Sequence, residues 1–227
     1  MASDERYLDP DDLPESIPVF PLQGAILLPR ATMPLHIFEP RYLMMVDDVL
    51  AGDRLIGIVQ PVEDPGEHQS PQSNNAPIRD IGCVGRLTSF TETEDDRVLI
   101  SLTGISRFVI AREENTDAPY RLFDVNFKPF AKDLISDGAE EGVDRDYLLS
   151  VLKAYLDNND LSADWESIHR SSNELLVNTL SMISPYGAEE KQALLEAADL
   201  KARAEVLIAL AEMDLAATDD GTGTTIQ

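Results

Sequence analysis

Hydrophobic and polar positions follow two different patterns along the chain, and the change falls near residue 131. Between residues 17 and 130 the apolar residues form short segments rich in β-branched and aromatic side chains, separated by Gly, Pro, Asp or Asn. This pattern is typical of β-strands joined by turns. Many short strands at modest spacing predict a closed or partly closed barrel. The expected strand segments are IPVFPL, LHIF, RLIGIVQPV, IGCVGRLTSF, RVLISLTGISRFVI and YRLFDVNFKPF.

Beyond a polar connector over residues 131–143, apolar residues recur at the spacing of a helix. One helical pattern should stop at Ser184-Pro185, because proline has no N–H to donate, and Asp199 has the character of an N-cap. Short connections between these segments predict a helical bundle over residues 144–217. The helical segments are DRDYLLSVLKAYLDNN, WESIHRSSNELLVNTLSMI, GAEEKQALLEAA and LKARAEVLIALAEMDLAA.

The expected fold class is therefore α+β, with a β-barrel domain over residues 17–130 followed by the helical bundle. Residues 1–16 are rich in acidic residues and proline without periodicity, which predicts a flexible arm. Residues 218–227 should form a disordered tail. The polar segment from Glu63 to Pro77 predicts a long exposed loop, and Thr91–Asp96 predicts the tip of a hairpin.

The stretch MPLHIFEPRYLMMVDDVL, residues 33–50, predicts a corner between a strand and a helix. In a short strand LHIF, His36 and Phe38 would share one face. Pro40 suits the first position of a helix, where its missing N–H would have no partner in any case. Glu39 would then lie at the positive end of the helix dipole, and Gly52 would end the helix.

Composition narrows the classes of function. The 227 residues carry a net charge of −24. Such a surface repels phosphate backbones, so nucleic-acid and anionic-membrane partners are not expected. Cys83 is the only cysteine, which excludes an internal disulfide and a cysteine-based metal site. No secretory signal or membrane-spanning run is evident, so we expect a cytoplasmic protein.

Catalytic and metal-binding motifs are absent from the sequence. It contains no GxxxxGK[ST] loop, no HExxH and no GxSxG elbow, so we expect no ATP-dependent step, no metal and no cofactor. The three histidines lie in a predicted strand, loop and helix without common spacing. The stretch beginning at Asp157 fails the EF-hand pattern, since position six is Ser162 and position twelve is Ile168. Arg107 is expected to pair with a carboxylate.

Four ordered segments resemble the N-terminal domain of Lon proteases. They are the IPVFPL opening, the PLHIFEPRY corner, the IGCVGRLTSF strand and the GISRF strand, and the resemblance continues over roughly residues 17–215. It implies a PUA-like barrel followed by a helical bundle. In full-length Lon proteases this region is implicated in engaging substrates, and the ATPase and Ser-Lys protease modules follow it. The chain ends at Gln227, which leads us to expect a stand-alone domain without peptidase activity.

The resemblance implies a non-catalytic module that binds exposed or unfolded protein segments, or a partner in proteolysis. We expect its contact surface at the PLHIFEPRY corner, where methionine and aromatic side chains give adaptable contacts. The sequence indicates no oligomeric state. The candidate protein-binding residues are Met33, His36, Phe38, Glu39, Arg41, Tyr42 and Met45.

Two alternatives stay open at this stage. An RNA-binding module would require a basic groove, for which the candidate residues are Arg30, Arg41, Arg86 and Arg107. A small-molecule enzyme would use His36 or Glu39 as acid or base, and would require a pocket with converging polar groups beside them.

Overall fold

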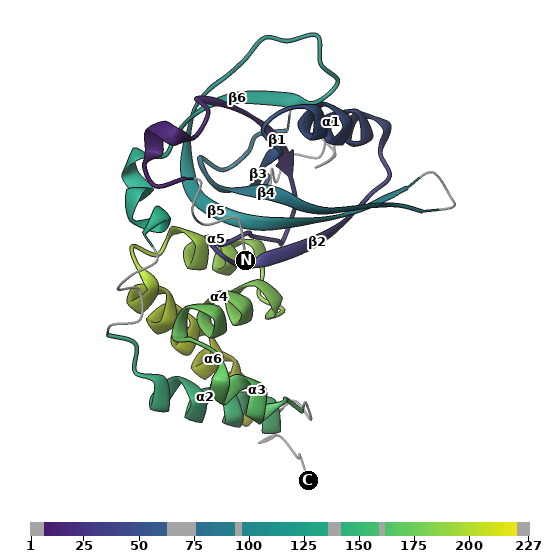
Figure 1. Cartoon of the computed structure of the whole chain (residues 1–227). Helices are drawn as coiled ribbons and strands as arrows, with labels where there is room; N and C mark the ends of the chain where they lie inside the picture. The colour runs from purple at the N-terminus through teal and green to yellow at the C-terminus, as the bar shows by residue number, and fades with distance from the viewer. Residues whose placement is uncertain (1–6, 63–75, 94–96, 136–141, 159–161, 222–227) are drawn as a thin grey trace. The chain divides into compact units, whose positions relative to one another are not determined.

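The computed structural model describes residues 7–62, 76–93, 97–135, 142–158 and 162–221. The chain divides into two compact units (Figure 1). The first comprises residues 1–136 and 186–195, and the second comprises residues 137–185 and 196–227. Strands in the first unit and helices in the second confirm the expected α+β class. Residues 186–195 group with the strands, although the sequence pattern had assigned them to the helical bundle.

The first unit is built on one mixed sheet of six strands. In sheet order these are β2 (Thr32–Ile37), β5 (Val98–Glu113), β4 (Ile81–Glu92), β3 (Leu55–Val59), β1 (Ser16–Pro21) and β6 (Arg121–Asn126). The second half of β5 also pairs with β6. The pairings β5–β4–β3–β1–β6–β5 therefore form a closed ring, and β2 is attached to the first half of β5.

The strands β2, β5 and β4 extend beyond this ring as a three-stranded arm (Figure 1). We define the arm as residues 32–37, 98–103 and 86–92. Every second residue of its β2 and β5 strands turns to the core side, as the alternation of a half-buried strand requires: Leu35 is half-buried, and Ile37, Val98, Ile100 and Leu102 are buried. The opposite face of the arm is open to solvent. The expected hairpin tip closes with Thr93 donating to the Arg97 carbonyl at 2.8 Å, and residues 94–96 lie outside the described residues.

The core of the first unit explains the GISRF segment. This segment lies within the expected strand segment RVLISLTGISRFVI, and β5 runs through it without a break. A Cβ on Gly104 would lie 2.0 Å from the Leu28 carbonyl oxygen, so only glycine allows this approach. Arg107, which is 3% exposed, pairs with Asp133 through its Nε at 2.8 Å and its Nη2 at 2.9 Å. This confirms the expected carboxylate partner, and Asp133 lies in the 3₁₀ segment η2 (Lys128–Leu134).

The N-terminal residues differ from the expected flexible arm. From Tyr7 onward they are packed, because Tyr7 and Leu13 join the buried core of the first unit. Between them lies a short 3₁₀ turn, η1 (Pro10–Asp12), which Asp9 and Asp12 cap reciprocally. Tyr7 and Leu13 are apolar residues within an acidic segment, and they were the signal for this packing that the prediction of a flexible arm overlooked. Residues 1–6 and 63–75 lie outside the described residues, so the arm's beginning and most of the Glu63–Pro77 loop do too.

Helix α5 (Ala188–Glu196) belongs to the first unit because buried amides attach it to the sheet. Gln60 donates to the Ala188 carbonyl at 2.9 Å and to the Gln192 side chain at 3.0 Å. Gln192 in turn donates to the Ile81 carbonyl at 3.2 Å. Such buried amide contacts depend on distant residues, so the local periodicity of α5 could not reveal them.

The second unit contains α2 (Arg145–Asn158), α3 (Trp165–Arg170), α4 (Asn173–Ile183) and α6 (Leu200–Gly221). The segment expected to form one helix over residues 165–183 is two helices, because Ser172 caps α4 by accepting from the Leu175 N–H. The expected end before Ser184-Pro185 and the N-cap at Asp199 are both present. Helix α6 continues to Gly221, into the segment expected to be a disordered tail.

Candidate functional site

The corner between β2 and helix α1 (Pro40–Ala51) forms as its sequence indicates. Pro40 occupies the first helical position and Gly52 follows the last. The Glu39 carbonyl accepts from the N–H groups of Tyr42 at 2.9 Å and Leu43 at 3.0 Å, which starts the helix. The Glu39 side chain makes no cap, and instead accepts from Arg41 through Nε at 3.0 Å and Nη2 at 2.8 Å.

Three of the seven expected contact residues point into the protein. Met33, Tyr42 and Met45 are buried, so they hold the corner together and are not available to a partner. Tyr42 packs edge-on against Phe20 with ring centroids 4.3 Å apart, and the Arg41 guanidinium lies 4.6 Å from the Tyr42 ring. Burial raises the pKa of the Tyr42 hydroxyl. The spacing of methionine and aromatic residues could not separate the core face of α1 from an exposed one.

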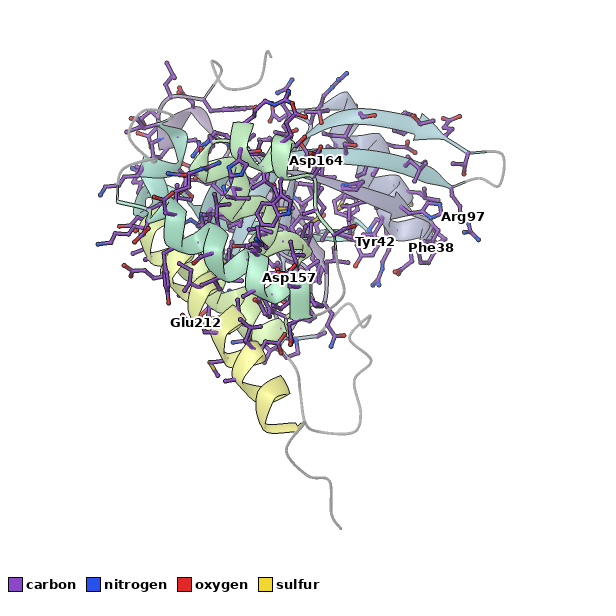
Figure 2. All side chains as sticks on the ribbon, turned by 90° about the horizontal axis from the view of Figure 1, so that it is seen from below. Phe38, Tyr42, Arg97, Asp157, Asp164 and Glu212 are labelled. Atoms are coloured by element: carbon purple, nitrogen blue, oxygen red, sulfur yellow. The ribbon has the colours of Figure 1, made fainter. Side chains whose placement is uncertain are left out.

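His36 and Phe38 are the expected residues that remain exposed. Phe38 is 60% exposed, and its ring lies edge-on to the His36 ring with centroids 6.3 Å apart. Ile37 pairs with Val98, which places Phe38 beside the residues that close the hairpin, and Figure 2 shows Phe38 and Arg97 at this end of the arm. Glu39 and Arg41 are half-buried and form an ion pair with each other.

The strand register adds residues that sequence reasoning missed. On the open face of the arm, His36 lies opposite Leu99, and Leu99 lies opposite Thr91 on the next strand. Leu99 is 45% exposed although it lies between the buried residues Val98 and Ile100. We call Phe38, His36, Leu99 and Thr91 the outer strip. Alternation within VLISL marks Leu99 as facing away from the core, but only the pairing of distant strands brings it beside His36.

The four arginines considered for an RNA groove have other partners. Arg41 pairs with Glu39, and Arg107 pairs with Asp133 inside the core. Arg30 donates to the Asp133 carbonyl at 2.6 Å, and Arg86 donates to the Tyr7 hydroxyl at 3.3 Å. Because these guanidinium groups serve internal contacts, the arrangement gives no support to a phosphate-binding groove.

The corner also lacks the arrangement that acid–base chemistry requires. The Glu39 carboxylate accepts a hydrogen bond from Arg41, and the His36 ring lies edge-on to the Phe38 ring at the surface. Among the described residues no group of three or more His, Cys, Asp or Glu side chains could hold a metal ion. Within the same residues, no helix is long and apolar enough to cross a bilayer.

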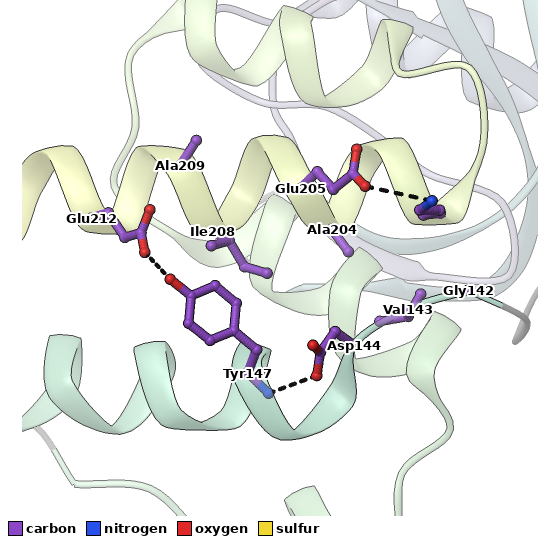
Figure 3. A pocket seen from close by; sticks show the side chains of 10 residues that line it. Gly142, Val143, Asp144, Tyr147, Ala204, Glu205, Ile208, Ala209 and Glu212 are labelled. Carbon is purple, nitrogen blue, oxygen red and sulfur yellow. Dashed lines mark hydrogen bonds and ion pairs between the residues drawn. The ribbon is translucent and has the colours of Figure 1, made fainter.

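The second unit contains an open pocket of about 320 Å³ between the start of α2 and one face of α6 (Figure 3). Its polar groups are paired with each other. The Tyr147 hydroxyl donates to Glu212, which raises the pKa of Tyr147. The Tyr147 N–H donates to Asp144 at 3.0 Å, and Lys201 lies 3.8 Å from Glu205. The Tyr147–Glu212 contact connects α2 with α6, whereas the other two contacts lie at the start of α2 and within α6. Together they leave no converging set of groups for a reaction.

Comparison with known proteins assigns the family. The family model of the ATP-dependent protease La (LON) substrate-binding domain matches residues 16–212. The chain belongs to this family. The match covers both structural units, including the PLHIFEPRY corner, the arm and the helices up to most of α6. The Lon-type assignment thus agrees with the order of the four sequence segments.

Curated relatives include full Lon proteases. The chain is 26% identical over 199 residues to the Lon protease of Desulfosudis oleivorans, covering 85% of this chain and 23% of that protein. It is 26% identical over 205 residues to the Lon protease of Flavobacterium johnsoniae, covering 88% of this chain and 24% of that protein. The chain therefore spans about a quarter of the length of the curated relatives it matches.

Solved structures show the same fold. A Lon N-terminal domain protein from Xanthomonas campestris matches with a TM-score of 0.59 and 21% identity, over 86% of this chain and 97% of that chain. The N-terminal domain of the Mycobacterium avium complex Lon protease matches with a TM-score of 0.62 and 18% identity, over 87% of this chain and 98% of that chain. The combination of sheet and helices described above is thus a Lon N-terminal architecture.

Proposed function

We propose that this Lon-type domain is a non-catalytic module that binds exposed or unfolded segments of other proteins through the outer strip. The observation that carries the proposal is the exposure of Phe38, which directly follows β2, and of Leu99 on the neighbouring strand β5. Large apolar side chains that gather on a surface are typical of sites that bind other proteins. Membership of the Lon substrate-binding family supports the same reading.

The geometry of the outer strip supports binding of client segments whose sequences vary. His36 and Phe38 offer an aromatic edge-to-face pair, Leu99 offers an aliphatic contact, and Thr91 can accept or donate a hydrogen bond. Such a surface recognises apolar side chains by area and shape, without requiring a particular sequence. Because no step in this recognition involves a nucleotide, the proposed binding is independent of ATP, and the module itself cleaves nothing.

The test is binding of a permanently unfolded, reduced and alkylated protein carrying a fluorescent label. We expect the wild-type chain to bind it without ATP, and the double variant Phe38→Ser with Leu99→Ser to bind at least about tenfold more weakly, since two apolar contacts are lost. The matched control changes Ile183 and Met213 to serine, because these apolar residues of the second unit are at least as exposed as Phe38 and Leu99. Equal loss in both double variants, or no binding by the wild type, would contradict the proposal.

A further inference from the structure

The arm has two lateral edges, and they differ in chemistry. Within the described part of the chain β2 pairs with β5 alone, so one side of β2 is an edge of the sheet. On the other side of the arm, β4 pairs with β3 as far as Arg86, and the Leu87 N–H donates to the Arg54 carbonyl at 2.8 Å. Among the described strands, none pairs with this side of β4 over Thr88–Glu92. Both edges are candidates for the addition of another strand.

Pro34 makes the open edge of β2 unfavourable for pairing with another strand. Pro34 lies in the middle of β2, and its neighbours Met33 and Leu35 pair with Leu102 and Ile100 on β5. Pairing that continues on both sides of a proline places its missing N–H on the open edge, where proline is tolerated within a sheet. An added strand would meet the pyrrolidine ring of Pro34 where it needs a backbone N–H donor, so the β2 edge is protected against pairing.

The β4 edge has no such protection. Its residues Thr88–Glu92, with the sequence TSFTE, contain no proline and no lysine, and all five are exposed. Thr93 donates to Arg97 across the hairpin. Alternation therefore turns the main-chain N–H and C=O of Phe90 and Glu92 away from β5, toward the open edge. These are backbone groups in extended geometry, and an extended polypeptide is the ligand whose backbone complements them.

We propose that the β4 edge over Thr88–Glu92 captures an extended segment of the client as an added strand, a role that rests on the proposed function and specifies how it works. Strand addition supplies affinity through main-chain hydrogen bonds, which are independent of the client's sequence. Side chains of the added strand that point to the open face of the arm would continue the row His36–Leu99–Thr91 beyond Thr91.

Charge and side-chain direction define the favoured segment. Residues of the added strand that face the outer strip should be apolar, because Leu99 and Phe38 lie on that face. Residues of the added strand that point to the opposite face of the arm would lie beside Glu92, and the chain as a whole carries a net charge of −24. The favoured client segment therefore alternates apolar residues with uncharged or basic residues, and acidic residues are disfavoured.

The test uses a fluorescent peptide in which valine and lysine alternate, with the full wild-type chain. Two further peptides carry N-methyl groups on either all valine or all lysine amides, which lie on opposite edges of an extended strand. With valines on the Leu99 face, only one set of amides faces β4. We expect one methylated peptide to bind at least about tenfold more weakly and the other to bind within about twofold of the parent. Equal affinities of the two methylated peptides would overturn the proposal.

Variants of the chain locate the edge. Glu92→Pro removes an outward N–H of β4, and Glu92→Ala is the matched control that removes the same charge and keeps the N–H. We expect Glu92→Pro to bind about tenfold more weakly than Glu92→Ala, because both lose the charge that faces the peptide's lysines and only Glu92→Pro also loses the N–H. Pro34→Thr restores a donor on the β2 edge and should leave affinity unchanged. A gain with Pro34→Thr would place the peptide on β2 and overturn the proposal.

The outcomes separate strand addition from the proposed function. Suppose that the wild-type chain binds the unfolded protein, that the Phe38 and Leu99 double variant binds it more weakly, and that the two methylated peptides bind with equal affinity. Strand addition is then wrong, and the proposed function of the outer strip stands. If the wild-type chain binds neither the unfolded protein nor the unmethylated peptide, both are wrong. The methylated peptides test the unchanged chain, so the result does not depend on the folding of any variant.

Discussion

At the scale of single residues, the most distinctive sequence features of the first unit serve structure. Gly104 allows the chain around Leu28 to approach β5, and Arg107 neutralises the buried Asp133 while its guanidinium also stacks 4.5 Å from the Phe130 ring. Arg107 further donates to the Leu195 carbonyl on α5 at 3.1 Å. The GISRF segment therefore marks the family because it joins β5, η2 and α5 in one core.

Removing Arg107 should be costly because it leaves a buried carboxylate without a partner. For Arg107→Met we expect a loss of about 3–5 kcal/mol in the free energy of unfolding, measured with urea. The control is Arg112→Met, which breaks the exposed ion pair with Asp124 and should change stability little. Similar free energies of unfolding for the two variants would contradict a large stabilising contribution from the buried Arg107–Asp133 pair.

Tyr120 provides a pH-dependent test of the first unit. Burial and the hydrogen bond that its hydroxyl donates to Asp48 at 2.7 Å raise the pKa of Tyr120 from 10.0 to about 12. The folded state therefore favours the neutral tyrosine. Its stabilising contribution is full below about pH 10 and is lost as the pH rises through about 12.

We expect the wild type to be more stable than Tyr120→Phe by a constant margin at neutral pH, and this margin should shrink between about pH 10 and 12. Urea unfolding of both proteins over this range measures it. Other tyrosines titrate in both proteins and cancel in the difference. A margin that does not change with pH would contradict the raised pKa of Tyr120 in the folded state.

At the scale of elements, local signals were predictable and long-range pairing was not. Pro40 and Gly52 marked the start and the end of α1, Pro185 marked the end of α4, and Asp199 marked the start of α6. Each of these residues acts within about one turn of the chain. The position of Leu99 beside His36 could not be predicted, since it depends on the register between β2 and β5. Three of the seven residues first expected at the contact surface proved to be buried, Met33 on the inner face of β2 and Tyr42 and Met45 on the core face of α1.

The break between α3 and α4 was missed although its cause is local. Ser172 accepts from the Leu175 N–H at 3.2 Å and starts α4. We expect Ser172→Ala to lower the free energy of unfolding by about 1 kcal/mol, because a helix loses its N-cap. Ser150→Ala is the control, since Ser150 lies inside α2 and alanine is the better helix former there. Thermal and urea unfolding of both variants would reveal whether Ser172 carries this role.

At the scale of the whole molecule, the order of elements along the chain does not match the two compact units. Helix α5 follows three helices of the second unit in sequence, yet it joins the first unit through Gln60, Gln192 and the Leu195 carbonyl. The chain thus leaves the first unit after residue 136 and returns to it at residue 186. The sequence pattern predicted strands followed by helices, but periodicity within α5 carries no information about which unit it joins.

Hydrogen–deuterium exchange of the full chain, with and without the unfolded client, tests the central claim most directly. Exchange reports which backbone amides become protected on binding. The account predicts slower exchange in β2, in the first half of β5 and above all over Thr88–Glu92 of β4, where an added strand would occupy the open edge. Protection confined to α2, α3, α4 and α6, with unchanged exchange in the arm, would contradict the account.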